Sequence, residues 1–176
     1  MKSNFKWVLI GAVIIVAGCS SNNIKQSGLV YFNDFESIKG WGGDMSRLTD
    51  NKAHSGHFST FVDSIHPYSY TFKLLFKDVS PDKIKGINYS VWCYADAMPI
   101  NGTIVVSAGT NSGSPIFWNG NNLDNYITEA GQWVKIKAHV DIDPKAVAPG
   151  NEFGFYLTNA SKATVFADDF TLEFTK

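Results

Sequence analysis

The sequence predicts an all-β protein, a two-sheet antiparallel β-sandwich (jelly roll), and two observations lead to it. After about residue 28 the hydrophobic residues recur with period two in short runs, the spacing of strands that bury one face. Gly, Pro, Asn and Asp separate the runs, and these residues form turns. There is no internal repeat and no convincing amphipathic helix, so many short strands with such turns indicate a sandwich or jelly roll.

Each expected strand is a run of this kind bounded by turn residues. In chain order the strands lie near residues 28–33, 57–63, 68–77, 86–96, 102–109, 114–118, 132–140, 152–158 and 164–174. The turn chemistry is carried, in the same order, by "DNKAHSG", "SPDKIKG", "MPING", "NGNNLDN" and "DPKAVAPGN". Nothing along these runs indicates a second domain.

The N-terminus has the pattern of a targeting segment. Lys2 and Lys6 precede an apolar run of eleven residues, 7–17, which is shorter than the roughly 20 residues that span a bilayer and suits a signal peptide. The following "VAGC" resembles the bacterial lipobox, whose Cys is lipidated and begins the mature chain. The resemblance implies a lipid anchor at Cys19 in the bacterial cell envelope, at the outer membrane or cell surface. An ordinary secretory signal with an incidental Cys19 is the alternative.

The expected organisation follows from this pattern. It comprises a signal peptide at 1–18, a flexible tether at 19–27 and a single β-sandwich domain at 28–176. The whole chain has a net charge of −1, and without residues 1–18 it holds 13 basic and 16 acidic residues, a net charge of −3. No Lys/Arg cluster appears, so nucleic acid is not an expected partner. With Cys19 acylated, Cys93 has no disulfide partner and is expected to be a small buried hydrophobe.

A succession of short motifs resembles a known family. "NDFES" and "GW" open the domain, "AHSGHFS" follows, the middle holds "INYSVWCYA" and "GQWVKIKAHVDI", and the end reads "TVFADDFTLEF". This order is similar to the jelly-roll carbohydrate-binding modules of the galactose-binding-like superfamily, over roughly residues 30–175. The resemblance implies the fold and, as a partner, a polysaccharide or oligosaccharide.

Two adjacent carboxylates, Asp168 and Asp169, lie in the apolar closing strand, where a buried carboxylate needs a partner. The first and last strands are neighbours in such a jelly roll, so Glu36 is expected beside them. Neither segment offers Lys or Arg, whereas the turn around Ser55 can offer backbone carbonyls. This oxygen-only set suits Ca²⁺, and related modules carry a structural Ca²⁺ at this place.

The predicted calcium ligands are therefore Glu36, Asp169, Asp168 and Ser55. Because neighbouring side chains on a strand face opposite sides, we expect Asp169 to turn inward and Asp168 to meet solvent. The alternative is a metal-free network in which the acids accept hydrogen bonds from backbone N–H groups and from Ser and Thr hydroxyls. His54 and His57 lie in a turn rather than on a helix, so a zinc pair is not expected.

Aromatic rings and amides are the usual groups of a sugar site. In "YSVWCYA" Val91 and Cys93 look like core, so Trp92 and Tyr94 are expected on the open, concave sheet face. "SPIFWNGNN" is expected to be a polar loop closing over one end of that face. The predicted ligand-binding residues are Trp92, Tyr94, Trp118 and Asn119, whereas Trp41 and Trp133 are expected to cover the core.

Signals for catalysis are missing. The sequence has no G-x-S-x-G, H-E-x-x-H, C-x-x-C or P-loop pattern. We therefore predict a lipid-anchored envelope protein that binds carbohydrate without hydrolysing it. Two alternatives remain: an adhesion or assembly protein that binds another protein through the same fold, and a glycan-active enzyme whose cleft the sequence does not reveal.

Overall fold

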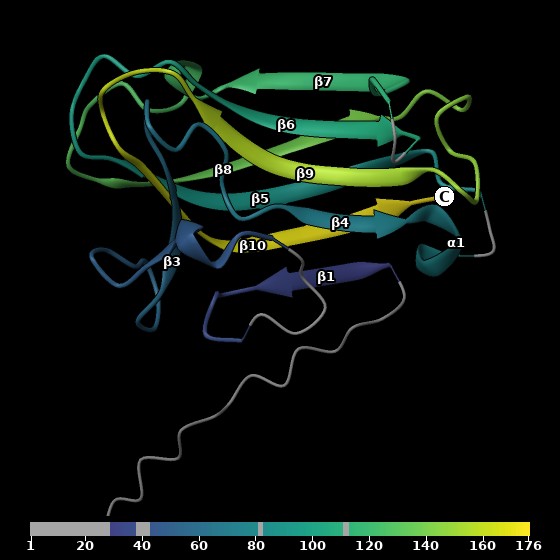
Figure 1. The fold of residues 1–176 in the computed structure, drawn as a ribbon, viewed down its shortest axis with the longest axis horizontal. Coiled ribbons are helices and arrows are strands. Elements are labelled where there is room, and N and C mark those ends of the chain that lie inside the picture. The colour runs from purple at the N-terminus through teal and green to yellow at the C-terminus, as the bar shows by residue number, and fades with distance from the viewer. Residues whose placement is uncertain (1–28, 38–42, 81–82, 111–112) are drawn as a thin grey trace, which may run out of the picture.

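The computed structural model describes residues 29–37, 43–80, 83–110 and 113–176, which form strands and a few short helical turns (Figure 1). In chain order these are β1 (Val30–Asn33), η1 (Met45–Arg47), β2 (Leu48–Thr49), β3 (Ser59–Val62), β4 (Phe72–Leu75), α1 (Phe76–Val79), β5 (Gly86–Ala95), β6 (Gly102–Gly109), β7 (Phe117–Asn122), η2 (Leu123–Asn125), β8 (Trp133–Asp141), β9 (Glu152–Asn159) and β10 (Val165–Thr175). No helix in these ranges is long and apolar enough to cross a membrane.

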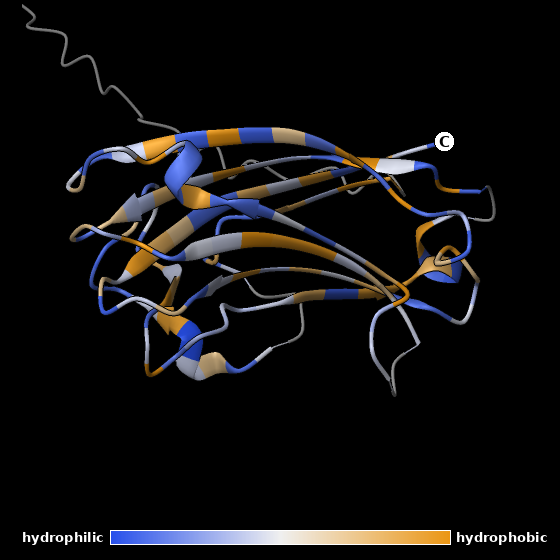
Figure 2. Cartoon of the chain, turned by 90° about the horizontal axis from the view of Figure 1, so that it is seen from above, coloured by the Kyte–Doolittle hydropathy of each residue, from blue (hydrophilic) through white to orange (hydrophobic). Residues whose placement is uncertain are grey.

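The strands form two antiparallel sheets that pack face to face (Figures 1 and 2). Sheet A has the order β2-β3-β10-β5-β8, and β1 also pairs with β10. Sheet B has the order β4-β9-β6-β7. The predicted two-sheet antiparallel β-sandwich is confirmed.

The core lies between the sheets and follows the alternation of side chains. On β5 the side chains of Val91 and Cys93 are fully buried, whereas Trp92 and Tyr94, which alternate with them, are half-buried on the opposite face. Figure 2 shows the same exchange of hydrophobic and hydrophilic residues along other strands. The expectation that Cys93 is a small buried hydrophobe is confirmed.

Two of the predicted strands differ from the structure. The run expected at 114–118 is instead β7, Phe117–Asn122, because its Asn residues and Gly120, which read as a turn, pair with β6. The run expected at 68–77 is broken: Tyr68 forms an isolated bridge with Thr158 on β9, and Phe72–Leu75 then pairs with β9 as a strand before the chain turns into α1. The two-residue strand β2 was not predicted, since so short a run has no detectable period.

Strand β10 changes partner along one edge. Its first part, at residues 165–167, pairs with β3, and its second part, at residues 170–173, pairs with β1. On its other edge it pairs with β5, and the register shifts between Asp168 and Thr171. Asp169 has φ +50° at this irregularity, after which Phe170 and Leu172 are again fully buried. The two adjacent acids therefore lie where the β3 and β1 pairings meet.

Candidate functional site

The outer face of sheet B, turned away from the core, is hollowed. On β6 the side chains of Val106 and Ala108 point into the core, so Ser107 between them points outward. Ser107 pairs with Gly154 on β9, and Gly154 pairs with Lys73 on β4. Directly paired residues share a face. A hollow of about 320 Å³ lies over these three strands.

Small residues form the floor of this hollow. A Cβ added at Gly154 would lie 2.7 Å from the Ser107 hydroxyl oxygen, so a larger residue does not fit there without a shift. The lining also includes larger side chains, such as those of Tyr68, Lys73 and Tyr156. The hollow is lined by Tyr68, Thr71, Lys73, Ser107, Ala108, Gly109, Thr110, Gly113, Pro115, Glu152, Gly154 and Tyr156.

Two tyrosine rings form one wall of the hollow. The Tyr68 side chain is 58 % exposed, and its ring centroid lies 6.0 Å from that of Tyr156. The ring planes are inclined by 60° to each other. The rings therefore flank a concave space rather than forming one flat platform.

The polar groups of the hollow are both charged and neutral. The Lys73 ammonium lies 3.0 Å from the Glu152 carboxylate, and both groups remain partly exposed. Hydroxyl groups of Thr71, Ser107 and Thr110 also belong to the lining. Rings beside groups that donate and accept hydrogen bonds can hold a molecule with apolar faces and many hydroxyl groups.

Trp118 lies on the same face, at the edge of the hollow. It pairs with Ser107 and its side chain is 55 % exposed. A Cβ at Gly120 would come within 2.7 Å of the Trp118 ring carbon Cζ3, so the indole lies across Gly120. Asn119 pairs with the core-facing Val106 and therefore points to the other side of the sheet. The expected loop that closes over the Trp92 face is not formed, because this segment is a strand of the opposite sheet.

Trp92 and Tyr94 lie on the outer face of sheet A, as the alternation predicted, but the turn that precedes β3 partly covers them. The His54 imidazole stacks on Trp92 at 4.0 Å with an interplanar angle of 16°. The Lys52 ammonium lies 4.1 Å above the Tyr94 ring. Since Trp92 and Trp118 point outward from opposite sheets, they do not contribute to one site.

The expectation that Trp133 covers the core is wrong. Trp133 pairs with Tyr94, so both rings lie on the outer face of sheet A, with centroids 5.5 Å apart. The sequence argument placed Trp133 beside the buried Ile136, but the two residues are an odd number of positions apart and face opposite sides. Trp41 and Cys19 lie outside the described residues.

Three predicted calcium ligands meet at one turn, residues 53–58, which we call the clasp turn. Its backbone N–H groups point at the carboxylates. The N–H groups of His54 and Ser55 donate to Asp168 (2.8 and 3.1 Å). Those of His57 and Phe58 donate to Glu36 (2.5 and 2.7 Å). The sequence argument expected this turn to offer carbonyl oxygens, whereas it offers N–H donors.

Side chains of the clasp turn complete the network on Asp169. The His54 Nδ1 lies 2.6 Å from one Asp169 oxygen, and the Ser55 hydroxyl donates to the other at 2.7 Å. The expectation that Asp169 is inward and Asp168 solvated is wrong, because Asp168 is fully buried beneath the turn while Asp169 is partly exposed. The His54 imidazole can carry a positive charge and is a partner of Asp169, and the sequence argument did not identify it as one.

Burial raises the pKa of Asp168 to about 6, although N–H groups of Ser55, Asp169 and His54 oppose that rise. The described residues do not fit a calcium site as arranged. Their carboxylates face N–H and O–H donors, and no three His, Cys, Asp or Glu side chains among them form a group that could hold a metal. Calcium therefore stays a prediction, and the hydrogen-bonded alternative describes the contacts observed.

Comparisons with known proteins agree with this architecture. No protein-family model and no curated protein matches the chain. Among solved structures, the CBM22-1 xylan-binding domain of Xyn10C from Paenibacillus barcinonensis is 18 % identical, with a TM-score of 0.52, over 83 % of this chain and 94 % of that one. The C-terminal family 22 carbohydrate binding module of Xyn10B from Clostridium thermocellum is 16 % identical, with a TM-score of 0.55, over 84 % and 93 %.

This chain has the jelly-roll fold of these modules. A family 16 carbohydrate binding module is similar too, at 16 % identity and a TM-score of 0.52, over 80 % of this chain and 94 % of that chain. At such identities the likeness concerns the fold. The predicted resemblance to jelly-roll carbohydrate-binding modules is thereby confirmed at the level of architecture.

Sequence reasoning missed most of the hollow. Tyr156 alternates with the buried Phe155 and Leu157 on β9, so the argument that turned Trp92 outward would also have turned Tyr156 outward. Tyr68 and Lys73 carry no comparable signal, because the run around them is not a continuous strand. Alternation also does not reveal which outer face is hollowed, since that depends on the loops beside it.

Proposed function

We propose that this domain binds a glycan chain, without hydrolysing it, in the hollow on the outer face of sheet B. The observation that carries the proposal is the pair of inclined tyrosine rings, Tyr68 exposed and Tyr156 partly buried, beside a floor of small residues. A pyranose ring has apolar faces that pack on aromatic rings and hydroxyl groups at its edge. Tyr68 and Tyr156 supply the rings, and Lys73, Glu152 and Ser107 supply hydrogen-bonding groups.

Two further observations support binding rather than hydrolysis. Glycosidases generally use two carboxyl groups about 5–10 Å apart across the sugar. The described lining of the hollow has one, Glu152, and it is paired with Lys73. Similar structures include xylan-binding domains, which makes xylan the first polysaccharide to test.

The test is binding of soluble xylan to the purified full chain, measured by calorimetry. Tyr68→Ala and Tyr156→Ala should each weaken binding about 5- to 10-fold, because one stacked ring contributes about 1 kcal/mol or more. Phe58→Ala is the matched control, since it removes a ring that is 42 % exposed and does not line the hollow. Denaturant melts should show that all three variants stay folded.

The proposal fails if the tyrosine variants bind as the wild type does. It also fails if neither xylan nor the soluble glucans, mannans and galactans of a wider panel bind the wild type. Slow release of reducing sugar from a bound glycan, abolished by Glu152→Gln, would contradict the non-catalytic part alone.

We further propose that the domain works at the bacterial cell envelope, held there by a lipid on Cys19. The apolar run at 7–17 and the "VAGC" pattern support this location. A glycan held near the membrane would then be presented to envelope enzymes or transporters.

A further inference from the structure

A second concave site lies on the opposite side of the sandwich, over the edge of sheet A. It is a pocket of about 160 Å³ lined by Thr49, Asn51, Phe61, Asp63, Thr164 and Phe166. We propose that this pocket binds a single neutral pyranose unit, independently of the glycan chain in the hollow of sheet B.

Two phenylalanine rings form the apolar part of the pocket. Phe61 on β3 pairs with Phe166 on β10, so the two side chains share a face. That face is the outer one, because the neighbouring Val62 and Val165 are fully buried in the core. The row continues across the sheet, since Phe166 also pairs with Tyr94. Phe61 is partly exposed, whereas Phe166 is only 8 % exposed, so an apolar sugar face would pack mainly against the Phe61 ring.

Side chains with hydrogen-bonding capacity surround these rings. Asn51 is exposed, and its side-chain amide forms no hydrogen bond with the described residues, although its backbone N–H donates to Thr49 at 3.1 Å. The Thr164 hydroxyl likewise has no partner among the described residues, while its N–H donates to Asp96. The amide and the hydroxyl are therefore available to a ligand.

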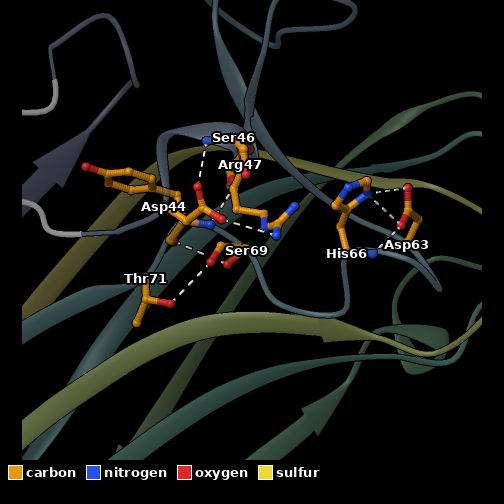
Figure 3. A network of polar contacts seen from close by, with 9 residues as sticks. Asp44, Ser46, Arg47, Asp63, His66, Ser69 and Thr71 are labelled. Atoms are coloured by element: carbon orange, nitrogen blue, oxygen red, sulfur yellow. Dashed lines mark hydrogen bonds and ion pairs between the residues drawn. The ribbon is translucent and has the colours of Figure 1, made fainter.

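The Asp63 carboxylate is held in place for accepting hydrogen bonds. One of its oxygens accepts the N–H groups of Ile65 and His66 (2.8 and 2.6 Å). Figure 3 shows the His66 ring turned onto the same carboxylate, with Nδ1 3.3 Å from the second oxygen. Burial alone would raise the pKa of Asp63, but these hydrogen bonds outweigh it and lower the pKa, so the group is ionised at neutral pH. Because the first oxygen is already occupied by these N–H groups, the second oxygen is the one that can accept a sugar hydroxyl.

Size and charge select the class of ligand. The pocket is smaller than the roughly 300–1,000 Å³ of drug-sized sites and corresponds to about five water molecules, which suits one sugar ring rather than a chain. Its charged lining residue is Asp63, an anion, so an acidic sugar would be repelled. A neutral pyranose matches the Phe61 ring, the amide, the hydroxyls and the carboxylate together.

The test uses amide NMR of the full chain, titrated separately with D-xylose, D-glucose, D-galactose and N-acetyl-D-glucosamine. At least one of them should shift the amides of Asn51 and Thr164 with a millimolar Kd, as expected for so few contacts. Asn51→Ala and Thr164→Val should each weaken that binding at least about fivefold, because each removes a hydrogen bond. Asn125→Ala, an exposed asparagine on η2, is the matched control and should bind normally.

The readout separates this site from the proposed glycan hollow. Shifts at Ser107, Gly154 and Tyr156 report the hollow, whereas shifts at Asn51 and Thr164 report the pocket. The inference is overturned if none of the four sugars shifts Asn51 and Thr164 up to about 50 mM, well above a millimolar Kd. It is also overturned if both variants, shown to be folded by their spectra, bind as tightly as the wild type.

Discussion

At the scale of single residues, Gly56 in the clasp turn is under two constraints. Its φ is +58°, a conformation that side chains other than glycine's rarely adopt. A Cβ at this position would also collide with the Glu36 carboxylate, which accepts the N–H groups of His57 and Phe58. The glycine therefore lets Glu36 approach the turn closely enough to bond it.

Gly56→Ala should lower the free energy of unfolding by about 2–4 kcal/mol, because the strain of the positive φ adds to the displacement of Glu36. Gly131→Ala is the control, since Gly131 has φ +88° but nothing within 4 Å of an added Cβ. That variant should lose only about 1 kcal/mol. Denaturant unfolding of both variants measures the difference, and equal losses would show that contact with Glu36 contributes nothing.

At the scale of elements, the clasp turn joins the two ends of the domain. Glu36 follows β1, the turn precedes β3, and Asp168 and Asp169 lie where β10 changes partner between those two strands. Backbone N–H groups, one imidazole and one hydroxyl meet the three carboxylates. This network accounts for two adjacent acids in an otherwise apolar strand.

Because protein groups already bond these carboxylates, the melting temperature of the full chain should be unchanged by the chelator EGTA. Asp169→Ala should lower it with or without EGTA, since His54 and Ser55 lose their acceptor. If the calcium predicted from the sequence is bound, the melting experiment gives a different result. At a hundredfold excess over its Kd it would contribute about 2.7 kcal/mol, so EGTA would lower the melting temperature by about 5–10 °C. That effect would disappear in Asp169→Ala.

The strands were predictable because their alternation is a local property of the chain. Runs such as 86–96 and 152–158 correspond to β5 and β9 almost residue by residue. β7 was misplaced because Asn and Gly have low strand propensity, and pairing with β6 overrides it. The partner of the buried acids was not predictable, since the direction of the N–H groups in the clasp turn depends on the tertiary position of that turn.

At the scale of the whole molecule, the sandwich separates two outer faces. Trp118 and the hollow with Tyr68 and Tyr156 lie on sheet B. Trp92, Tyr94 and the pocket lined by Phe61 and Phe166 lie on sheet A. The sequence argument placed Trp92, Tyr94 and Trp118 in one site, although they belong to opposite faces. Alternation shows which side chains of a strand share a face, but it does not show which sheet the strand joins. Strand order follows from long-range pairing, such as β10 lying between β3 and β5.

The proposed anchor concerns how this molecule is held in the envelope. A single apolar run of eleven residues is too short to span a bilayer, so in this proposal the attachment comes from a lipid on Cys19. Cys19→Ala should therefore leave the protein as an unprocessed precursor or release it from membranes, as measured by fractionation and by mass spectrometry of the N-terminus. Cys93→Ala is the control, because Cys93 is fully buried within the domain and should not affect attachment. A Cys19→Ala protein that is cleaved and sediments with membranes like the wild type would show that attachment does not depend on a lipid.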